Sequence, residues 1–473
     1  MITLRVVLES LKGSAPSWAE LIIPDVSIDS RTLIPGSMFI ALKGESVDGH
    51  DFVSYAFSNG ASFALIDHPV RDELRVLDLR TGSKTDLETD LEIPFCLLVD
   101  NSLEALQKVA GDWRRKLDLR IIGITGSVGK STTKELTTTV LKQRYRTLKN
   151  PGNLNNEIGL PMTLWKLSDG HDRAVLEMGF YVPGEIKFLC DLAKPSVGVL
   201  TTIGTVHAEK AGTQDEIARG KAELVQALPA APDGVAILNY DDDLVKAMAD
   251  QTDARIFYYG LNSEAELWAD QVEGLGLEGI KFRLHYQGET IHLKVPLIGR
   301  HSVHTVLRSA AVGLVEGLSW GEISRGLKSE HTQLRLVAVR ATCGAMILDD
   351  TYNASPKSML ADLNLLEEMD GRKVAVLGDM LELGRYEEQG HRKVGIRAAE
   401  VANILVTVGD RALIIANSAA DYGLDQSIIH SFPESAAAVE FLDKFLNEDD
   451  VVLIKGSRGM RMDKIVAALE VES

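Results

Sequence analysis

The stretch that most constrains what this chain can fold into is residues 121–135, IIGITGSVGKSTTKE. An apolar run, a glycine loop and a helix-forming segment in that order predict a strand, a tight turn and a helix start. Backbone N–H groups of such a loop point inward and, together with the helix dipole, form a pocket for phosphate. In this pocket Lys130 would reach the β- and γ-phosphates of a nucleotide, and the Ser131 hydroxyl would bind Mg²⁺.

The loop departs at one position from the strict pattern G-x-x-x-x-G-K-[ST], because Ile124 stands where the pattern has glycine. The alternative interpretation is a structural glycine turn. The strand-like run before the loop and the helix-forming TTKELTTTVLKQR after it supply the context that the motif needs. We therefore favour a phosphate loop.

The length and charge of the chain limit the classes of function that remain. The chain has 473 residues, which is too long for one core, and about 150 residues per domain suggests roughly three domains. Its net charge of −18 argues against a general binder of nucleic acid or of anionic membranes. Phosphate ligands would therefore be held by local loops and a few cations.

The cysteines and the apolar segments indicate the environment of the protein. Cys96, Cys190 and Cys343 are far apart, without metal-type spacing, and each lies in or beside an apolar run. We expect buried free thiols in a reducing cytosol. The first residues carry no signal-peptide pattern, and no run approaches the roughly 20 apolar residues of a membrane span. We therefore expect a soluble, cytoplasmic protein.

Residues 1 to about 100 carry short strand-like pieces and one polar triplet. Asp29, Ser30 and Arg31 precede a Pro-Gly turn and offer a carboxylate, a hydroxyl and a guanidinium suited to a ribose or a diphosphate. The alternative is a salt bridge within the turn. Residues 71–94 have the composition of a polar surface loop without chemistry.

Between about residues 101 and 320, apolar β-like runs alternate with helical patterns, which predicts a parallel sheet wound with helices. Ligands bind at the carboxyl ends of strands in such sheets, and polar residues follow three of the runs. A lone His or Glu is more often structural, but three strand ends together favour a site. We expect strands at 120–125, 173–178, 196–202, 235–239 and 254–259, with Glu177, His207, Asn239 and Asp241 at or after their ends.

This region also contains an amide-rich loop, a helix-forming segment with a lysine, and a segment of alternating polarity. The loop 150–161, NPGNLNNEIGLP, is rich in amides, which suit sugar hydroxyls and phosphate oxygens together. The helix-forming QDEIARGKAELVQAL contains Lys221, which sequence alone would place in solvent. Residues 264–297 alternate apolar and polar side chains and predict antiparallel strands without chemistry.

From about residue 321 a second α/β pattern begins, with strands expected near 345–349, 373–378, 403–408, 427–431 and 451–455. Three polar turns follow these strands. The first precedes a helix opened by Pro356, and the last is expected at a helix N-terminus, a natural anion contact. The turns carry Asp349, Asp350, Tyr352 and Asn353; then Asp379 and Glu382; then Lys455, Ser457 and Arg458.

The loop variant T-G-S-x-G-K-S-T resembles that of the Mur ligase superfamily, whose members use ATP to join an amino acid or dipeptide to a growing peptide. The resemblance covers about residues 25 to 465. It implies three α/β domains: a small UDP-binding domain (1–100), a central phosphate-loop ATPase with a parallel sheet (101–320) and a Rossmann-like domain (321–473). The implied ATP contacts are Thr125, Gly126, Ser127, Val128, Gly129, Lys130, Ser131, Thr132, Asn239, Asp241, Arg335 and Asp350.

Two segments resemble the family's patterns for the uridine-diphosphate-muramoyl substrate. The first follows D-S-R-x-x-x-P-G-x-x-F-x-A-L-x-G-x-x-x-D-G-H-x-F, and the amide loop follows N-x-N-N-x-x-G-x-P. The resemblance therefore assigns to this substrate Asp29, Ser30, Arg31, Lys43, Gly44, Asp48, Gly49, His50, Asn153, Asn155 and Asn156.

The resemblance also implies two Mg²⁺ sites. Lys221 matches the family lysine that CO₂ carbamylates, which turns a cation into a carboxylate-like oxygen ligand for the second Mg²⁺. His207 would share that metal, while Ser131 and Glu177 would bind the first. The implied catalytic set is Lys130, Glu177, His207 and Lys221.

The three C-terminal turns resemble those of the family member that adds D-alanyl-D-alanine. Its D-D-S-Y-N-A-x-P-x-S-M occurs here with Thr351 for Ser and Ser355 for its usual asparagine, while G-D-M-x-E-L-G and K-G-S-R-x-M are intact. Arg335 aligns with a family arginine that contacts an ATP phosphate. The implied dipeptide contacts are Tyr352, Asn353, Asp379, Glu382, Lys455, Ser457 and Arg458.

The resemblance thus implies a monomeric ATP-dependent ligase that joins D-alanyl-D-alanine to UDP-N-acetylmuramoyl-tripeptide through an acyl phosphate, with lysine or diaminopimelate as the third peptide residue. Two alternatives remain. A folylpolyglutamate synthase would share the central loop but lack the Asp29-Ser30-Arg31 region, and a nucleotide-regulated binding protein would not need Glu177, His207 and Lys221.

One segment departs from the family. Residues 299–311 read GRHSVHTVLRSAA, against the pattern G-x-H-N-x-x-N-A-L-A-A-A. Ser302 and Thr305 replace asparagines whose amides can both donate and accept. We expect adenine recognition to be weaker, unless neighbours such as His301 or His304 have taken over the contact.

Overall fold

The computed structural model describes residues 1–70, 74–83, 92–329 and 336–471. The predicted ATP contact Arg335 lies outside the described residues. The chain forms two compact units. The first comprises Met1–Gly123, Tyr145–Gly179 and Glu185–Ser196, and the second comprises Ile124–Arg144, Phe180–Gly184 and Val197–Ser473.

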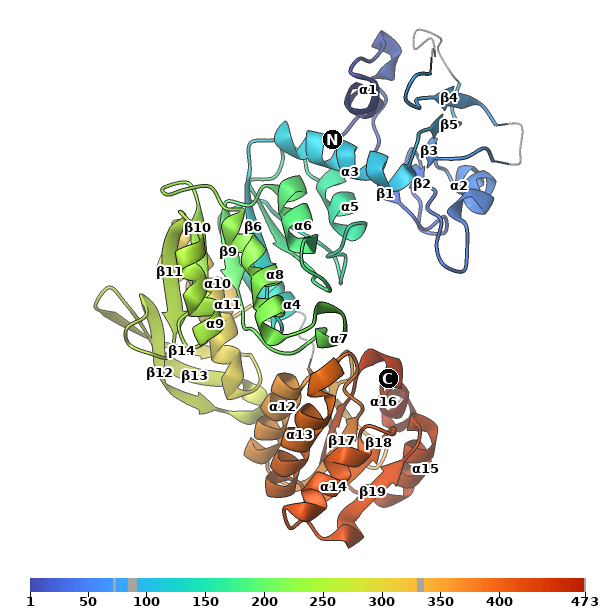
Figure 1. Ribbon diagram of the computed structural model, residues 1–473. Coiled ribbons are helices and arrows are strands. Elements are labelled where there is room, and N and C mark those ends of the chain that lie inside the picture. Colours follow the sequence, from blue (N-terminus) through green and yellow to red (C-terminus); the bar gives the residue numbers. More distant parts are fainter. Residues whose placement is uncertain (71–73, 84–91, 330–335, 472–473) are drawn as a thin grey trace. The chain divides into compact units, whose positions relative to one another are not determined.

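The N-terminal part of the first unit is built on a five-stranded sheet in the order β1-β2-β3-β5-β4 (Figure 1). All its strand pairs are parallel. Phe39, Ala64 and Cys96 project from the sheet into a core that also contains Val53 and Ala56 of helix α2 (Val53–Ser58). The strands are β1 (Val26–Ser27), β2 (Met38–Ile40), β3 (Phe63–Ile66), β4 (Val76–Asp78) and β5 (Phe95–Leu98), and helix α1 is Leu4–Lys12.

Strand β4 corrects the prediction of a polar loop over residues 71–94. Val76–Asp78 pairs with β5, and Leu77, the central residue of β4, is buried. The strand is three residues long and lies at the sheet edge, so its single inward apolar side chain left no alternating pattern in the sequence.

A nine-stranded sheet follows in the order β14-β13-β12-β11-β10-β9-β6-β8-β7. Strands β9, β10 and β11 are parallel, as are β7 and β8, while β12 to β14 are antiparallel. The predicted strands of this region are confirmed; β7 was not foreseen. The strands are β6 (Arg120–Thr125), β7 (Thr147–Lys149), β8 (Arg173–Glu177), β9 (Val197–Leu200), β10 (Val235–Asn239), β11 (Arg255–Gly260), β12 (Leu267–Gly274), β13 (Ile280–Tyr286) and β14 (Glu289–Val295).

The helices around this sheet belong to both units. In the second unit, helix α4 packs against α10 and α11. The first unit contains α3 (Ser102–Arg115), α5 (Gly159–Trp165) and α6 (Glu185–Ala193); the second contains α4 (Lys130–Leu141), α7 (Ala208–Ala211), α8 (Gln214–Gln226), α9 (Asp243–Lys246), α10 (Val303–Val315) and α11 (Trp320–Leu327).

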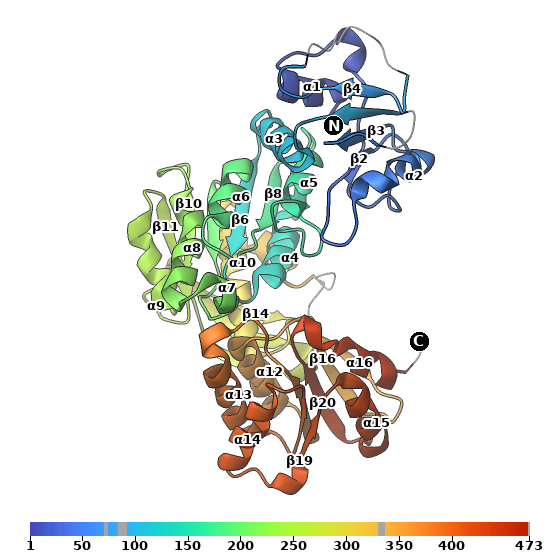
Figure 2. The same ribbon diagram turned by 45° about the vertical axis from the view of Figure 1, so that its right-hand side comes forward.

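The C-terminal part of the second unit is a six-stranded sheet covered by helices on both faces (Figures 1 and 2). Alternation along the strands creates the two faces. Leu348, Leu377 and Leu453 share one core with helices α12 to α14, while Val376 and Ile454 share the other with α15 and α16. The order is β15-β16-β20-β17-β18-β19. The elements are β15 (Val337–Arg340), β16 (Met346–Asp350), α12 (Pro356–Glu368), β17 (Arg372–Gly378), α13 (Glu387–Val401), β18 (Ile404–Val408), α14 (Leu413–Asp421), β19 (Ile429–Phe432), α15 (Ser435–Phe445), β20 (Asp450–Lys455) and α16 (Asp463–Leu469).

The three helix-covered sheets confirm the predicted α/β fold class. The three cysteines are free as expected, but Cys343 is exposed. It lies in the tight turn that joins β15 to β16, so the apolar residues after it enter the sheet while the cysteine does not. Among the described residues, no helix is long and apolar enough to cross a membrane.

Candidate nucleotide site

The predicted phosphate loop joins β6 to α4 in the conformation that the motif requires. Gly126 has φ +143° and Gly129 has φ +83°, values that side-chain-bearing residues rarely adopt. A Cβ on Gly126 would lie 1.8 Å from the Thr201 hydroxyl oxygen, so only glycine fits there. Helix α4 begins at Lys130 with Gly129 as its N-cap. The N–H groups of its first turn are therefore available to an anion.

Two lysines converge on one end of this loop. Lys130 Nζ donates to the Gly126 carbonyl at 2.9 Å, and Lys221 Nζ donates to the same oxygen at 3.2 Å. Lys221 is 1% exposed, and its ammonium also lies 4.3 Å from the centre of the Phe180 ring. The solvated position that sequence alone would assign to Lys221 is therefore wrong, because α8 turns this face inward. Two ammonium groups at one carbonyl form a strong local site for an anion.

His207 lies beside these lysines. It precedes helix α7 with φ +66°, and its Nδ1 lies 2.5 Å from a carboxylate oxygen of Glu382. Burial lowers the pKa of His207, and Lys130 and Lys221 add to that shift, while Glu382 opposes it. The imidazole therefore remains neutral near pH 7, the form that can ligate a metal. Glu382 was predicted to contact the dipeptide, and here it positions His207.

A cavity of about 340 Å³ opens next to the other end of the loop. Several of the predicted contacts line it. Its lining from the loop and its helix is Ser127, Val128, Gly129 and Thr132; Asn239 comes from the end of β10; and Asp350, Asn353 and Lys455 come from the six-stranded sheet and the turn after β16.

The part of the cavity near residues 298–308 contains the two departures from the family pattern. Ser302 donates its hydroxyl hydrogen to the Ile298 carbonyl at 2.7 Å, and the Thr305 hydroxyl accepts from Arg308 at 2.8 Å. Asp241, a predicted ATP contact, does not line the cavity. Its carboxylate is used internally, accepting from the backbone N–H groups of 261 and 262 and pairing with His304 at 2.9 Å.

Three charged side chains form a buried cluster at the end of β20. Lys455 pairs with Asp350 and, at 3.0 Å, with Asp362, and its ammonium also donates to the Asn353 carbonyl at 3.1 Å. Burial alone would lower the pKa of Lys455, but Asp362 and Asp350 outweigh burial and hold it above its ordinary value. Burial also raises the pKa of Asp362, although Lys455 opposes that shift. All three side chains line the cavity.

The other predicted dipeptide contacts divide into buried and exposed groups. Asp379 is buried and accepts from the Ala412 N–H at 2.7 Å, while the Ser457 hydroxyl accepts from the Leu381 N–H at 2.8 Å. Each of these two side chains therefore ties its own turn to a segment that is distant in the sequence. Tyr352 and Arg458 are exposed. The helix N-terminus predicted here is wrong, since residues 458–460 form a single 3₁₀ turn and α16 begins only at Asp463.

In the first unit, Glu177 lies at the end of β8 as predicted and is 1% exposed. Its carboxylate accepts from the Asn155 amide at 2.9 Å. The Asn150 side chain donates to the Glu177 carbonyl and accepts from the Glu177 N–H. Asn156 accepts from the Gly159 N–H at 2.9 Å at the start of α5. The amide loop thus positions Glu177 and caps the start of α5. Asn153 contributes its backbone carbonyl, which accepts from the Asn155 N–H within the loop.

The predicted uridine-diphosphate contacts also lie in the first unit. Asp29 pairs with Arg31 through Nε at 2.9 Å and Nη2 at 2.7 Å, which is the salt bridge of the alternative interpretation. Arg31 lowers the pKa of Asp29 to about 2. The Arg31 guanidinium is exposed. Ser30 is buried, and its carbonyl accepts from the Asn59 amide. Lys43 and Gly44 form the turn that leads to Asp48.

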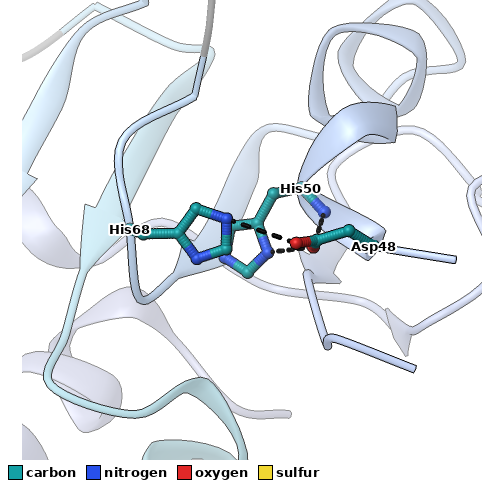
Figure 3. Close-up of side chains that lie close together, drawn as sticks. All are labelled: Asp48, His50 and His68. Carbon is teal, nitrogen blue, oxygen red and sulfur yellow. Dashed lines mark hydrogen bonds and ion pairs between the residues drawn. The ribbon is translucent and has the colours of Figure 1, made fainter. Parts of the chain in front are cut away.

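Figure 3 shows Asp48 beside His50 and His68. The two imidazole rings are stacked, with their centres 3.6 Å apart. The ligand atoms of these three residues lie within 4.8 Å of one another. His50 is buried, however, and both ring nitrogens are engaged: Nδ1 with Asp48 at 2.7 Å, and Nε2 as acceptor of the Asp67 N–H at 3.1 Å. His50 therefore has no lone pair left for a metal, and it fixes the loop that carries Asp48.

Sequence reasoning missed several residues of the cavity, among them Asp362, Lys357 and Arg308. Lys357 donates to the Ile203 carbonyl at 2.9 Å. Arg308 had a signal in the sequence, because it is a lone arginine on a mostly apolar helix. Asp362 had none, since an acidic residue in a helix is ordinarily solvated.

Comparisons with known proteins agree with the motifs. Three family models match: "Mur ligase family, catalytic domain" over residues 23–80, "Mur ligase middle domain" over 124–313 and "Mur ligase, glutamate ligase domain" over 334–458. A UDP-N-acetylmuramoyl-tripeptide–D-alanyl-D-alanine ligase from Bacillus subtilis is 34% identical over 474 residues, covering 99% of this chain and 98% of that relative. The chain belongs to the Mur ligase family. The resemblance drawn from the motifs is confirmed.

Solved structures of Mur ligases are similar along the whole chain. MurF from Acinetobacter baumannii has a TM-score of 0.83 at 29% identity, covering 98% of each chain. MurF from Thermotoga maritima, in complex with ADP, has a TM-score of 0.78 at 26% identity, covering 95% of this chain and 97% of that one.

Proposed function

We propose that this Mur ligase joins D-alanyl-D-alanine to UDP-N-acetylmuramoyl-tripeptide at the expense of ATP, in the synthesis of peptidoglycan precursors. The observation that carries the proposal is the phosphate loop with two lysine ammonium groups, Lys130 and Lys221, on the Gly126 carbonyl. The full-length similarity to relatives named for this reaction supports the choice of substrates.

The chemistry requires ATP because a carboxylate is a poor acyl donor. The peptide carboxylate attacks the γ-phosphorus, which releases ADP and forms an acyl phosphate. The dipeptide amine then adds to the acyl carbon, loses a proton, and displaces inorganic phosphate as the amide forms. Lys130 would bind the transferred phosphoryl group and spread its developing charge. The loop N–H groups would hold the phosphates in line.

Two Mg²⁺ ions would neutralise charge on the phosphates. By the family resemblance Ser131, the second residue of α4, and Glu177 would bind the first ion, since a hydroxyl and a carboxylate are oxygen ligands. Neutral His207 fits the second. The Lys221 ammonium cannot ligate a cation, so its place in this set requires carbamylation by CO₂.

The substrate ends are assigned by the same proposal. Asp29, Arg31, Lys43, Asp48 and the amide loop would hold the uridine-diphosphate end, and Tyr352, Arg458 and their neighbours the dipeptide. Domains of 1–100, 101–320 and 321–473 would bring acceptor, ATP and donor together. We propose that the enzyme acts as a monomer in the cytoplasm.

Phosphate release tests the proposal. Purified protein, ATP and Mg²⁺ are assayed with UDP-N-acetylmuramoyl-tripeptide carrying either lysine or diaminopimelate. D-alanyl-D-alanine is the donor, and D-alanine or L-glutamate is the control. We expect stoichiometric phosphate and a lengthened peptide with the dipeptide alone. Turnover of a pteroylglutamate with glutamate would instead identify a folylpolyglutamate synthase, and ATP binding without turnover of any pair would identify a binding protein.

A further inference from the structure

Arg308 lies in the mostly apolar helix α10, and its side chain lines the nucleotide cavity. It is 4% exposed and lines the cavity together with Gly129 and Thr132. The pattern G-x-H-N-x-x-N-A-L-A-A-A has alanine at the position where this chain has Arg308. A buried arginine is costly unless an anion or several acceptors compensate it.

The protein compensates Arg308 only in part. Nε donates to the Thr133 hydroxyl at 2.6 Å, Nη2 to the Thr305 hydroxyl at 2.8 Å, and Nη1 to the Tyr259 hydroxyl at 3.5 Å. All three acceptors are neutral, and no described carboxylate forms an ion pair with Arg308. A guanidinium has five N–H donors. One hydrogen on each terminal nitrogen therefore remains for a ligand in the cavity.

The place of the guanidinium along the loop indicates which part of a nucleotide it meets. Nη2 lies 2.6 Å from where a Cβ on Gly129 would be, so it lies against the start of α4. Lys130 and Lys221 gather at Gly126, the other end of the loop. A phosphate-loop lysine reaches the β- and γ-phosphates. Arg308 is thus at the end of the phosphate chain that is closer to the nucleoside.

Thr305 connects this arginine to the departure from the family pattern. Its hydroxyl, in place of an asparagine, is the acceptor that orients Nη2. The hydroxyl hydrogen of Ser302 is held by the Ile298 carbonyl. Where the family pattern has two asparagine amides, this side of the cavity therefore has two engaged hydroxyl groups and the Arg308 guanidinium.

We propose that Arg308 binds the α-phosphate of ATP and ADP through its two remaining N–H groups. A planar guanidinium can donate two parallel hydrogen bonds to phosphate oxygens. The contact is the same before and after γ-phosphoryl transfer, so it contributes to binding in both states and acts mainly on KM. The inference rests on the proposed placement of the nucleotide.

The test compares Arg308→Gln with the native protein in its affinity for ADP, AMP and adenosine, measured by displacement of radiolabelled ADP. Glutamine keeps an amide for the Thr133 or Thr305 hydroxyl but removes the charge. A charge-assisted hydrogen bond is worth enough to weaken ADP and AMP by about ten- to hundredfold. We expect equal loss for ADP and AMP, unchanged affinity for adenosine, and a weaker dependence of ADP affinity on salt.

The unchanged adenosine affinity shows within the same variant that the cavity is folded. Arg114→Gln is the matched control, because Arg114 is also a buried arginine, and its guanidinium donates to the carbonyls of 193, 117 and 119. It should leave all three affinities unchanged. Thr305→Val should weaken ADP and AMP by a smaller common factor.

Three results would each overturn the inference. Equal loss for adenosine would place Arg308 on the base or in the packing, loss for ADP without AMP would place it on the β-phosphate, and no loss would remove it from the ligand. Failure of the proposed function looks different, since it would abolish phosphate release in the native protein or remove ADP binding altogether.

Discussion

Replacing Lys455 by methionine should destabilise the six-stranded sheet in a pH-dependent way. Lys455 is 1% exposed and joins Asp350 at the end of β16 to Asp362 in α12, the latter at 3.0 Å. Methionine keeps most of the volume but leaves two carboxyl groups without their cation. Breaking a buried ion pair from one side costs about 3–5 kcal/mol.

The pH dependence follows from Asp362. Burial raises its pKa to about 7, although Lys455 opposes the shift. Between the ordinary pKa and this value the native state binds more protons than the unfolded state, so stability falls as pH rises through that window. Without Lys455 the pKa of Asp362 rises further, and the fall continues above pH 7. At about 1.36 kcal/mol per pH unit, Lys455→Met should cost about 1.4 kcal/mol more at pH 8 than at pH 5.

Amide hydrogen exchange of peptides from β20, corrected for the intrinsic rate at each pH, measures this free energy. Tryptophan fluorescence would not, because all five tryptophans precede residue 321. Lys455→Met/Asp362→Leu should recover at least half of the loss and remove the pH dependence, since it deletes the more deeply buried of the two stranded carboxyl groups. Equal cost at both pH values, or a double variant as unstable as the sum of the single ones, would refute the reasoning.

Three further predictions concern the phosphate loop and are measured by phosphate release or ADP binding. Lys130→Ala should lower kcat/KM by about 10²–10³-fold, as the loss of one stabilising donor does; a variant with half the native activity would exclude Lys130 from the transition state. Lys221→Arg should be as damaging as Lys221→Ala, because guanidinium keeps the charge but cannot be carbamylated, and normal turnover would show a plain cation. Gly126→Ala should abolish ADP binding, because the new Cβ would lie 1.8 Å from the Thr201 hydroxyl, whereas Gly82→Ala, at φ +81° in open space, should not; retained binding would contradict the loop geometry.

The elements of this protein could be predicted from local patterns. The apolar runs and glycine loop around residues 121–135 determine a strand, a turn and a helix start within a few residues of each other, and the structure has them there. Glu177 and Asn239 end their strands for the same local reason. Short edge strands such as β4 and β7, each of three residues, were missed because so few residues carry no periodicity.

Some predicted site residues bind the protein's own backbone, because a polar side chain in a turn can accept from a backbone N–H group as well as from a ligand. Asp379 and Asp241 both accept from backbone N–H groups of segments distant in the sequence. The sequence places such a residue at a strand end, but the orientation of its carboxylate depends on which N–H groups lie within reach. His50 shows the same outcome, since its two nitrogens hold Asp48 and the Asp67 N–H.

The chain by itself therefore determined the glycine loop, the longer strands and the family motifs, since each rests on neighbouring residues. Tertiary structure alone decided which charges meet. His207 and Glu382 are 175 residues apart, and Arg308 and Thr133 are also separated by 175. Lys221 and Asp362 look like solvated helix residues until α8 and α12 are packed. Burial and pairing are properties of the packed helices and sheets, and no local pattern encodes them.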